Sequence, residues 1–305
     1  MITLESAALT LDLEPRRGAK IASMRQRATG REWIEGDQTL PADPPDPGVS
    51  FDEGDMCGWD EMMPTIEPCR YPGGDLELAD HGELWRRAWD VVEVTAMSAA
   101  AATTTTVDPV LGCRIFRTLR LVDETLLIEY ALTNESSAER CVLWAAHPLF
   151  AHRPGTRLVL EGLLVETDEG EGQVRTWPAD GLSLDTLAAG EYQKLFARGC
   201  VPRPRATLID ADGPWLRLGW SRDDASYLGI WLDQAALARH PVVALEPTNA
   251  GHDALDVALA SDRFDRAWCL APGASRRWRL EVTTGTTKSV VAAGSPGTMT
   301  RSMDR

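Results

Sequence analysis

The sequence lacks the signatures of several large protein classes. No run of about 18 apolar residues occurs in its 305 residues, so we expect no helix that spans a membrane. The first residues, Met1 to Ser6, carry neither the positive charge nor the apolar stretch of a secretory signal. The chain also contains no phosphate-binding loop, no dinucleotide-binding glycine motif and no internal repeat. These absences predict a cytoplasmic protein with no membrane partner.

Basic residues are in deficit. The chain has 31 Lys and Arg residues against 46 Asp and Glu residues, which gives a formal net charge of −15. A surface with this excess of negative charge repels a phosphate backbone, and no stretch of the sequence concentrates lysine and arginine as a local exception. We therefore expect no nucleic-acid partner and no binding to anionic membranes.

Cysteine is sparse and irregularly spaced. The six cysteines stand at positions 57, 69, 113, 141, 200 and 269, and no two of them form a Cys-x-x-Cys pair. A scaffold held together by disulfides needs far denser cysteine, so the sequence predicts reduced and mostly buried thiols. A zinc site formed by Cys57, Cys69 and His81 is an alternative, although this spacing matches no common ligand pattern. We expect no metal.

The chain does contain a long series of short segments with the period of β-strands. Polar and apolar residues alternate from 9 to 14, from 113 to 122 and from 126 to 133, with turn residues between the last two. No long amphipathic helix interrupts the series. We predict one antiparallel β domain over residues 1–285, either a sandwich or a barrel. Residues 286–305 are rich in Gly, Ser, Thr and Pro, and we expect them to form a disordered tail.

Two neighbouring stretches combine acids, a histidine, glycine and tryptophan. The first is Gly58-Trp59-Asp60-Glu61-Met62-Met63-Pro64-Thr65, and the second begins Asp80-His81-Gly82-Glu83-Leu84-Trp85. Aromatic faces together with carboxylates are more typical of a sugar-binding cleft than of a packing layer. Asp60 and Glu61 could bind sugar hydroxyls, and of the two we favour Asp60. The alternative is that both acids cap or solvate a loop.

Two further residues have the placement that acid–base chemistry needs. His147 follows the apolar run from Val142 to Ala146, Glu246 follows the run from Val242 to Leu245, and a proline comes directly after each. Proline forces the preceding residue into extended geometry and removes an N–H, so we expect both side chains at rigid strand ends facing a cleft. Burial should raise the pKa of Glu246 toward neutrality, as a general base requires. The alternatives are an acid paired with an arginine and a histidine of the core.

In their order and wide spacing, four motifs of the chain resemble those of the aldose 1-epimerases, the galactose mutarotase family. They are Gly18-Ala19-Lys20-Ile21-Ala22-Ser23, His81-Gly82, His147-Pro148-Leu149-Phe150 and Leu245-Glu246-Pro247-Thr248. The resemblance implies an all-β fold, the large antiparallel and distorted β-sandwich called the galactose mutarotase-like supersandwich. It also implies an isomerase that interconverts the α and β anomers of a small sugar by acid–base ring opening, without metal or cofactor.

The resemblance assigns roles to individual residues. It implies that Glu246 is the catalytic base, that His147 is the catalytic acid and that His81 binds sugar hydroxyls. The alternative for His81 is a turn histidine before Gly82. Family members place an aspartate well before the Glu-Pro motif; here Lys194 stands in roughly that interval and is a candidate substrate contact, with a surface lysine as the alternative. Trp231 is a candidate platform for stacking on the sugar, or else part of the core.

The sequence departs from the family at positions that concern the substrate. Leu149 stands where galactose mutarotases have a tyrosine two residues after the acid, and Trp85 stands where the related hexose-6-phosphate epimerases have an arginine. These differences leave open which sugar is bound and whether it is phosphorylated or acidic. Alternatives to a mutarotase are a non-catalytic sugar-binding or sensing protein and a glycoside hydrolase or lyase. The oligomeric state is open as well.

Overall fold

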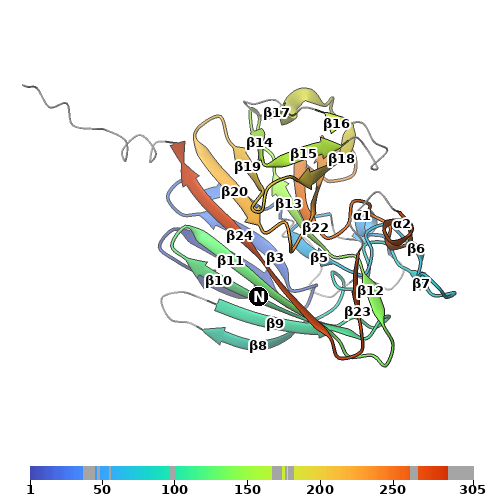
Figure 1. Cartoon of the computed structure of the whole chain (residues 1–305). Helices are drawn as coiled ribbons and strands as arrows, with labels where there is room; N and C mark the ends of the chain where they lie inside the picture. Colours follow the sequence, from blue (N-terminus) through green and yellow to red (C-terminus); the bar gives the residue numbers. More distant parts are fainter. Residues whose placement is uncertain are drawn as a thin grey trace, which may run out of the picture.

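Two large antiparallel β-sheets pack face to face and form most of the protein (Figure 1). The structure is a computed structural model, and it describes residues 1–36, 45–46, 49–54, 56–95, 101–166, 174–175, 177, 182–261 and 267–287. The short helices α1 (Phe51–Gly54) and α2 (Leu255–Ala260) lie together at one end of the molecule, on the right in Figure 1.

The first sheet has eleven strands and carries the candidate site described below. In spatial order its strands are β1 (Ile2–Glu5), β2 (Leu9–Glu14), β3 (Lys20–Gln26), β5 (Trp59–Met62), β13 (Ala145–Ala151), β22 (Val242–Thr248), β21 (Tyr227–Asp233), β18 (Tyr192–Gly199), β15 (Leu163–Glu166) and β16 (Val174–Arg175), with β4 (Arg31–Glu32) paired to β3.

The second sheet has nine strands. Their order is β17 (Leu182–Ser183), β14 (Arg157–Glu161), β19 (Arg205–Ile209), β20 (Pro214–Trp220), β24 (Ser275–Thr286), β11 (Thr125–Asn134), β10 (Cys113–Val122), β9 (Ala101–Val107) and β8 (Asp90–Thr95). Two small pairs complete the fold: β6 (Cys69–Arg70) with β7 (Glu77–Leu78), and β12 (Arg140–Val142) with β23 (Trp268–Leu270). A short 3₁₀ turn spans Leu184–Thr186.

The main core lies between the two sheets and follows from the alternation in the sequence. In β10 every second residue from Cys113 onward is buried, and these side chains meet the inward-facing residues of the first sheet, such as Leu11 and Ile21. A second apolar cluster lies on the opposite face of the first sheet, where Phe51 of α1 and Leu255 of α2 cover the strands. The central strands β5, β13, β22 and β21 are therefore buried on both faces, which explains the nearly continuous apolar runs of β13, β22 and β21.

The fold confirms the predicted antiparallel β-sandwich. The hairpin of β10 and β11 forms in register from Cys113 opposite Asn134 to Val122 opposite Thr125, as the alternating pattern predicts. The last strand, β24, continues through Thr286, one residue past the predicted domain end. The rest of the predicted tail lies outside the described residues from position 288 onward.

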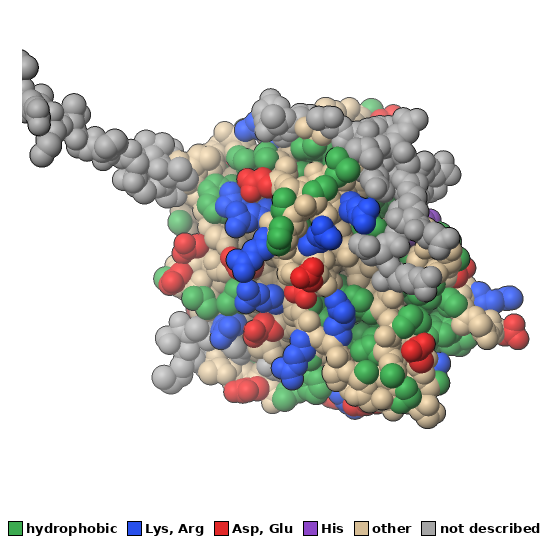
Figure 2. Space-filling model, in the orientation of Figure 1, with side chains coloured by type: hydrophobic (Ala, Val, Ile, Leu, Met, Phe, Trp, Pro, Cys, Tyr) green, Lys and Arg blue, Asp and Glu red, His purple; other side chains and the backbone are tan. Residues whose placement is uncertain are grey.

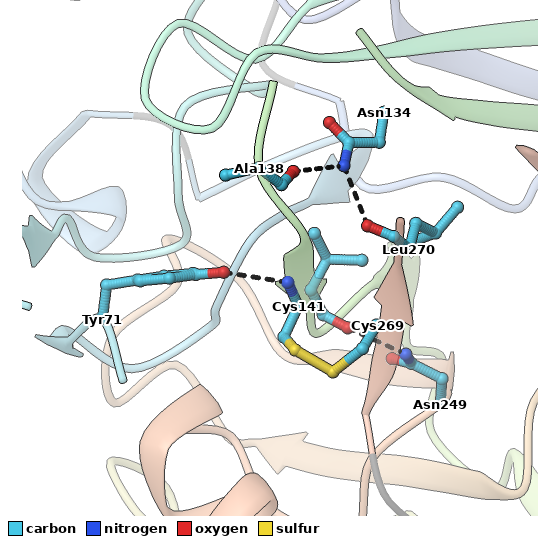
Figure 3. Close-up of a disulfide and its surroundings, with 8 residues drawn as sticks. Tyr71, Asn134, Ala138, Cys141, Asn249, Cys269 and Leu270 are labelled. Carbon is cyan, nitrogen blue, oxygen red and sulfur yellow. Dashed lines mark hydrogen bonds between the residues drawn. A yellow bond between two sulfur atoms is a disulfide. The ribbon is translucent and has the colours of Figure 1, made fainter. Parts of the chain in front are cut away.

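The prediction of reduced thiols is wrong for one pair of cysteines. Cys141 of β12 and Cys269 of β23 are directly opposite each other in an antiparallel pair and form a disulfide, although 128 residues separate them (Figure 3). Their spacing along the chain carries no sign of this pairing, because it arises only when the two short strands meet. Figure 3 also shows the hydroxyl of Tyr71 accepting a hydrogen bond of 2.8 Å from the backbone N–H of Cys141.

None of the described helices is long and apolar enough to cross a membrane.

Candidate active site

A cavity of about 330 Å³ lies on the outer face of the first sheet, the face covered by α1 and α2. Five of the six predicted site residues line it, and they come from widely separated parts of the chain. They are His81, His147, Lys194, Trp231 and Glu246. The fold therefore brings together residues that the sequence separates by up to 165 positions, from His81 to Glu246.

His147 and Glu246 are in register with each other on the neighbouring strands β13 and β22. The ladder between these strands is formed by Ala145 with Thr248 and again by Leu149 with Ala244, and it is interrupted in between. A proline follows each of the two residues inside this interruption, and proline has no N–H to donate to a ladder. The expectation that both residues end their strands is wrong: each strand continues past its proline, and the gap lies within the sheet.

The two side chains approach each other in a buried setting. Nε2 of His147 lies 3.7 Å from Oε1 of Glu246, and their side chains are 5% and 1% exposed. This separation is too long for a hydrogen bond, and neither Oε1 of Glu246 nor Nδ1 of His147 has a hydrogen-bond partner among the described residues. Two buried polar atoms without partners are unusual in a core, and here both belong to residues that line a cavity that a ligand could occupy.

Burial shifts the pKa values of both groups away from their charged forms. The pKa of Glu246 is raised by desolvation, although the neighbouring Lys194 opposes the shift. The pKa of His147 lies well below its usual 6.5 because of desolvation first, and then because of the positive charges of His81, Lys194 and Lys20. Glu246 therefore has the raised pKa expected of a general base, whereas His147 is a neutral imidazole at neutral pH.

Lys194 and Asp253 complete a chain of charges around Glu246. Nζ of Lys194 lies 2.6 Å from Oε2 of Glu246 and 3.3 Å from Oδ2 of Asp253. The pKa of Lys194 is raised, since these two carboxylates outweigh the effect of desolvation. Lys194 thus stays charged and holds one oxygen of Glu246, which leaves Oε1 as the oxygen available to a substrate.

Gly229 of β21 makes room for the carboxylate of Glu246. The two residues are partners across β21 and β22, and a Cβ added at Gly229 would lie 2.7 Å from Oε2 and 3.2 Å from Cβ of Glu246. Such contacts are shorter than van der Waals separation, so any larger residue must displace the Glu246 side chain. A glycine in the interior of a strand often marks such a close approach.

We expect Gly229→Ala to move the Glu246 carboxylate away from His147 without unfolding the protein. Because a displacement of about 1 Å in a catalytic group can cost roughly 10²-fold in rate, any activity that depends on Glu246 should fall by about this factor. The matched control is Gly219→Ala, also within a strand, where the added Cβ would meet only Cγ of Arg205 at 3.8 Å. If the two variants have the same melting temperature and the same activity, this role of Gly229 is contradicted.

The His81-Gly82 pair forms a tight turn that aims the imidazole at the cavity. Both residues have left-handed backbone geometry, with φ values of 55° and 65°, and a Cβ at Gly82 would lie 1.9 Å from the carbonyl oxygen of Met63. Nδ1 of His81 lies 2.9 Å from Oδ1 of Asp80, whose other oxygen accepts the backbone N–H of Phe51. The ring of Phe51 stacks on His81 at 4.5 Å, so the turn, the carboxylate and the ring together fix the histidine.

The prediction that Asp60 contacts the substrate is wrong for this structure. Asp60 is fully buried and does not line the cavity; its carboxylate forms a salt bridge with Lys20, which is also buried. Asp60 lies directly opposite His147 across β5 and β13, on the same face of the sheet, but its carboxylate is engaged by Lys20. The pair contributes to the site through Lys20, whose charge lowers the pKa of His147.

Aromatic rings form one wall of the cavity. Trp231 is 8% exposed, and the ring of Tyr192, which is 57% exposed, lies 6.4 Å away. Such flat apolar faces suit the C–H surfaces of a sugar ring.

Sequence reasoning missed Tyr192, Asp253, Asp80 and Phe51 as members of the site. For Asp253 the one available signal was a glycine-containing loop soon after the Glu-Pro strand, and this is too weak to assign a role.

Within the described ranges, no three His, Cys, Asp or Glu side chains are grouped so that they could hold a metal ion. The alternative zinc site does not assemble among the described residues: Cys57, Cys69 and His81 form no such group, and Cys57 does not line the cavity that His81 lines.

Comparison with solved structures identifies the fold. A protein of Synechocystis sp. PCC 6803 named Slr1438 superposes with a TM-score of 0.73 over 93% of this chain and 95% of its own, at 17% sequence identity. A galactose mutarotase-like protein from Lactobacillus casei gives 0.68 over 93% and 100% of the two chains, at 20% identity. A galactose mutarotase related enzyme from Lactobacillus acidophilus gives 0.70 over 94% and 97%, at 15% identity. The chain has the galactose mutarotase-like fold.

At these identities the similarity establishes the fold alone. No protein-family model and no curated protein sequence matches this chain.

Proposed function

We propose that this protein is an aldose 1-epimerase-like mutarotase, an isomerase that interconverts the α and β anomers of a small sugar. The observation that carries the proposal is the pair of Glu246 and His147, which face each other at 3.7 Å across an interrupted ladder at the base of the cavity. Anomerisation opens the hemiacetal ring, rotates the bond between C1 and C2, and closes the ring on the other face. This reaction needs one group that accepts a proton and one that donates a proton.

Glu246 is the base and His147 is the acid in this proposal. The hydroxyl at C1 and the ring oxygen are both bonded to C1, so two groups 3.7 Å apart can contact both oxygens of one sugar. The free Oε1 of Glu246 removes the proton from the C1 hydroxyl while His147, in its imidazolium form, gives a proton to the ring oxygen and becomes a neutral imidazole. The C1–O bond to the ring then breaks, and the open aldehyde forms without a net change in protons. Ring closure on the opposite face reverses each transfer.

The remaining residues bind and orient the sugar. His81 is fixed by Asp80 and Phe51 and is placed to hold a hydroxyl, while Trp231 offers an apolar face. Lys194 keeps one oxygen of Glu246 occupied and favours its ionised form. The proposed chemistry uses only side chains of this chain and requires neither metal nor cofactor, in a cytoplasmic protein whose partner is a small-molecule sugar.

One observation favours a second candidate, a non-catalytic sugar-binding or sensing protein on the same fold. The salt bridge of 2.6 Å between Lys194 and Glu246 opposes the rise in the pKa of the carboxylate and thus weakens it as a base. A cavity whose base is neutralised in this way could bind a sugar without converting it. Both candidates bind a sugar, but only the mutarotase interconverts its anomers.

The test is a panel of aldoses, uronic acids and sugar phosphates, followed by NMR detection of anomer exchange at several pH values. The imidazolium of His147 forms only well below pH 6.5, and Glu246 is ionised only above its raised pKa. We therefore expect catalysed exchange for at least one sugar, with a rate that rises as the pH falls below neutral and drops when Glu246 takes up a proton. Binding without exchange at any pH would favour the sensing protein, and neither binding nor exchange would refute both candidates.

A further inference from the structure

A second hollow lies on the outer face of the nine-stranded sheet, in a different part of the molecule from the sugar cavity. Its volume is about 250 Å³, and four arginines line it: Arg203, Arg205, Arg217 and Arg279. Figure 2 shows basic side chains gathered over the face that carries β20, β24 and β11, with fewer acidic ones between them. This concentration stands out in a chain with a net charge of −15.

Strand alternation assembles the arginines from three strands and a loop. Arg205 of β19, Gly219 of β20 and Glu281 of β24 lie in one row across the sheet, and Arg217 pairs with Thr207 and Thr283 in the next row. Leu216, Leu218 and Trp220 alternate with these outward residues and are buried on the core side. Arg203 precedes β19, and the sequence separates it from Arg279 by 76 positions, so no sequence window could reveal the cluster.

Gly219 creates the hollow at the centre of the cluster. It stands between Arg205 and Glu281, and a Cβ added there would meet only Cγ of Arg205, at 3.8 Å. The backbone at this point is ordinary for a strand, so neither a turn nor a steric conflict requires glycine. A glycine in a strand interior lowers strand stability and often marks the close approach of a ligand.

Positive charge exceeds negative charge in the lining of the hollow. Glu281 is its one acid against four arginines. Three more acids approach from outside: Glu161 lies 4.0 Å from Arg205 in an exposed pair, Glu129 lies opposite Arg279 across β11 and β24, and the carboxylate of Asp224 accepts the backbone N–H of Arg279. The exposed pair of Glu161 and Arg205 is weak, and a multivalent anion can displace it. The guanidinium of Arg217 is held by Thr207 at 3.3 Å and by the ring of Trp215 at 5.3 Å, which leaves it preorganised.

We propose that this hollow is a binding site for a phosphate-bearing small molecule. Arginine presents a planar fork of N–H donors that matches two oxygens of a phosphate, and several such forks converge here around one opening. The hollow is large enough for a mono- or diphosphate group and is lined by only one acid. The site is separate from Glu246 and His147, so it does not depend on the proposed isomerase activity.

The experiment is a calorimetric titration of the folded protein with inorganic pyrophosphate at constant ionic strength. We expect saturable binding to one site. Arg279→Gln and Arg217→Gln should each weaken binding about tenfold, because each removes a charge-assisted hydrogen bond. Gly219→Leu keeps every charge and fills the hollow, so it should abolish binding. Its effect separates a shaped site from a diffuse positive surface.

Two control variants test whether pyrophosphate binds in the hollow. Arg277→Gln removes an outward-facing arginine of the same strand that does not line the hollow, and it should leave pyrophosphate affinity within about twofold of the wild type. Glu246→Gln should also leave that affinity unchanged. Three results would each overturn the proposal. They are an equal loss of pyrophosphate affinity in Arg277→Gln and Arg279→Gln, wild-type affinity in Gly219→Leu, and the absence of saturable binding to the wild-type protein.

Discussion

Glu246→Gln should lower the rate of catalysed anomer exchange by about 10²–10⁴-fold, the usual contribution of a general base. Glutamine keeps the shape of the side chain and can still accept a hydrogen bond from Lys194, so sugar affinity should be largely retained. The loss should therefore appear in the rate constant at saturating sugar. NMR exchange rates and a separate binding titration on the same preparation measure the two quantities.

His147→Asn should lower the rate of anomer exchange by a similar factor. The double variant Glu246→Gln/His147→Asn should be little slower than either single variant. Both groups act in one ring-opening step, so the removal of either already disables the concerted route. Glu67→Gln is a matched control because it neutralises a different acid of the same cavity, and it should change the rate far less. A folded Glu246→Gln protein with the wild-type rate would exclude Glu246 from the mechanism.

The sequence predicted the strands and the residues that line the cavity better than it predicted the geometry of the site. Alternation along β10 and β11 is local, so the hairpin could be predicted from the sequence alone. The prolines after His147 and Glu246 marked two residues that the fold places opposite each other, but for a reason that only the sheet shows. They interrupt the ladder between two adjacent strands, and the sequence has no information on which strands become adjacent.

Contacts between distant segments could not be predicted for the same reason. The disulfide of Cys141 and Cys269, the space that Gly229 leaves for Glu246, and the bond between Lys194 and Asp253 all depend on register between strands or loops far apart in the chain. A single glycine or cysteine carries no local pattern from which its partner can be inferred.

The neighbours Asp60 and Glu61 show how alternation decides the fate of two similar acids. Asp60 points toward the outer face of the first sheet, beside His147 on the neighbouring strand, whereas Glu61 points into the core between the sheets. There Glu61 accepts hydrogen bonds from Arg117 at 2.9 Å, Tyr130 at 2.8 Å and Trp144 at 2.9 Å. Desolvation raises the pKa of Glu61, and Arg117 opposes this shift. The carboxylate links β5 of one sheet to β10 and β11 of the other.

Arg117→Met should reduce the free energy of unfolding by about 3–5 kcal/mol, because it leaves Glu61 as a buried acid without its counter-charge. Both side chains are fully buried, and Arg117 also donates a hydrogen bond to the backbone carbonyl of Ala19. The double variant Glu61→Gln/Arg117→Met should recover part of the loss, since glutamine still accepts hydrogen bonds and carries no charge. Arg114→Met is the control on the same strand: it removes an exposed ion pair with Glu135 and should change stability far less. Denaturant unfolding of the four proteins measures these differences, and equal losses for Arg114→Met and Arg117→Met would show that the buried pair does not hold the two sheets together.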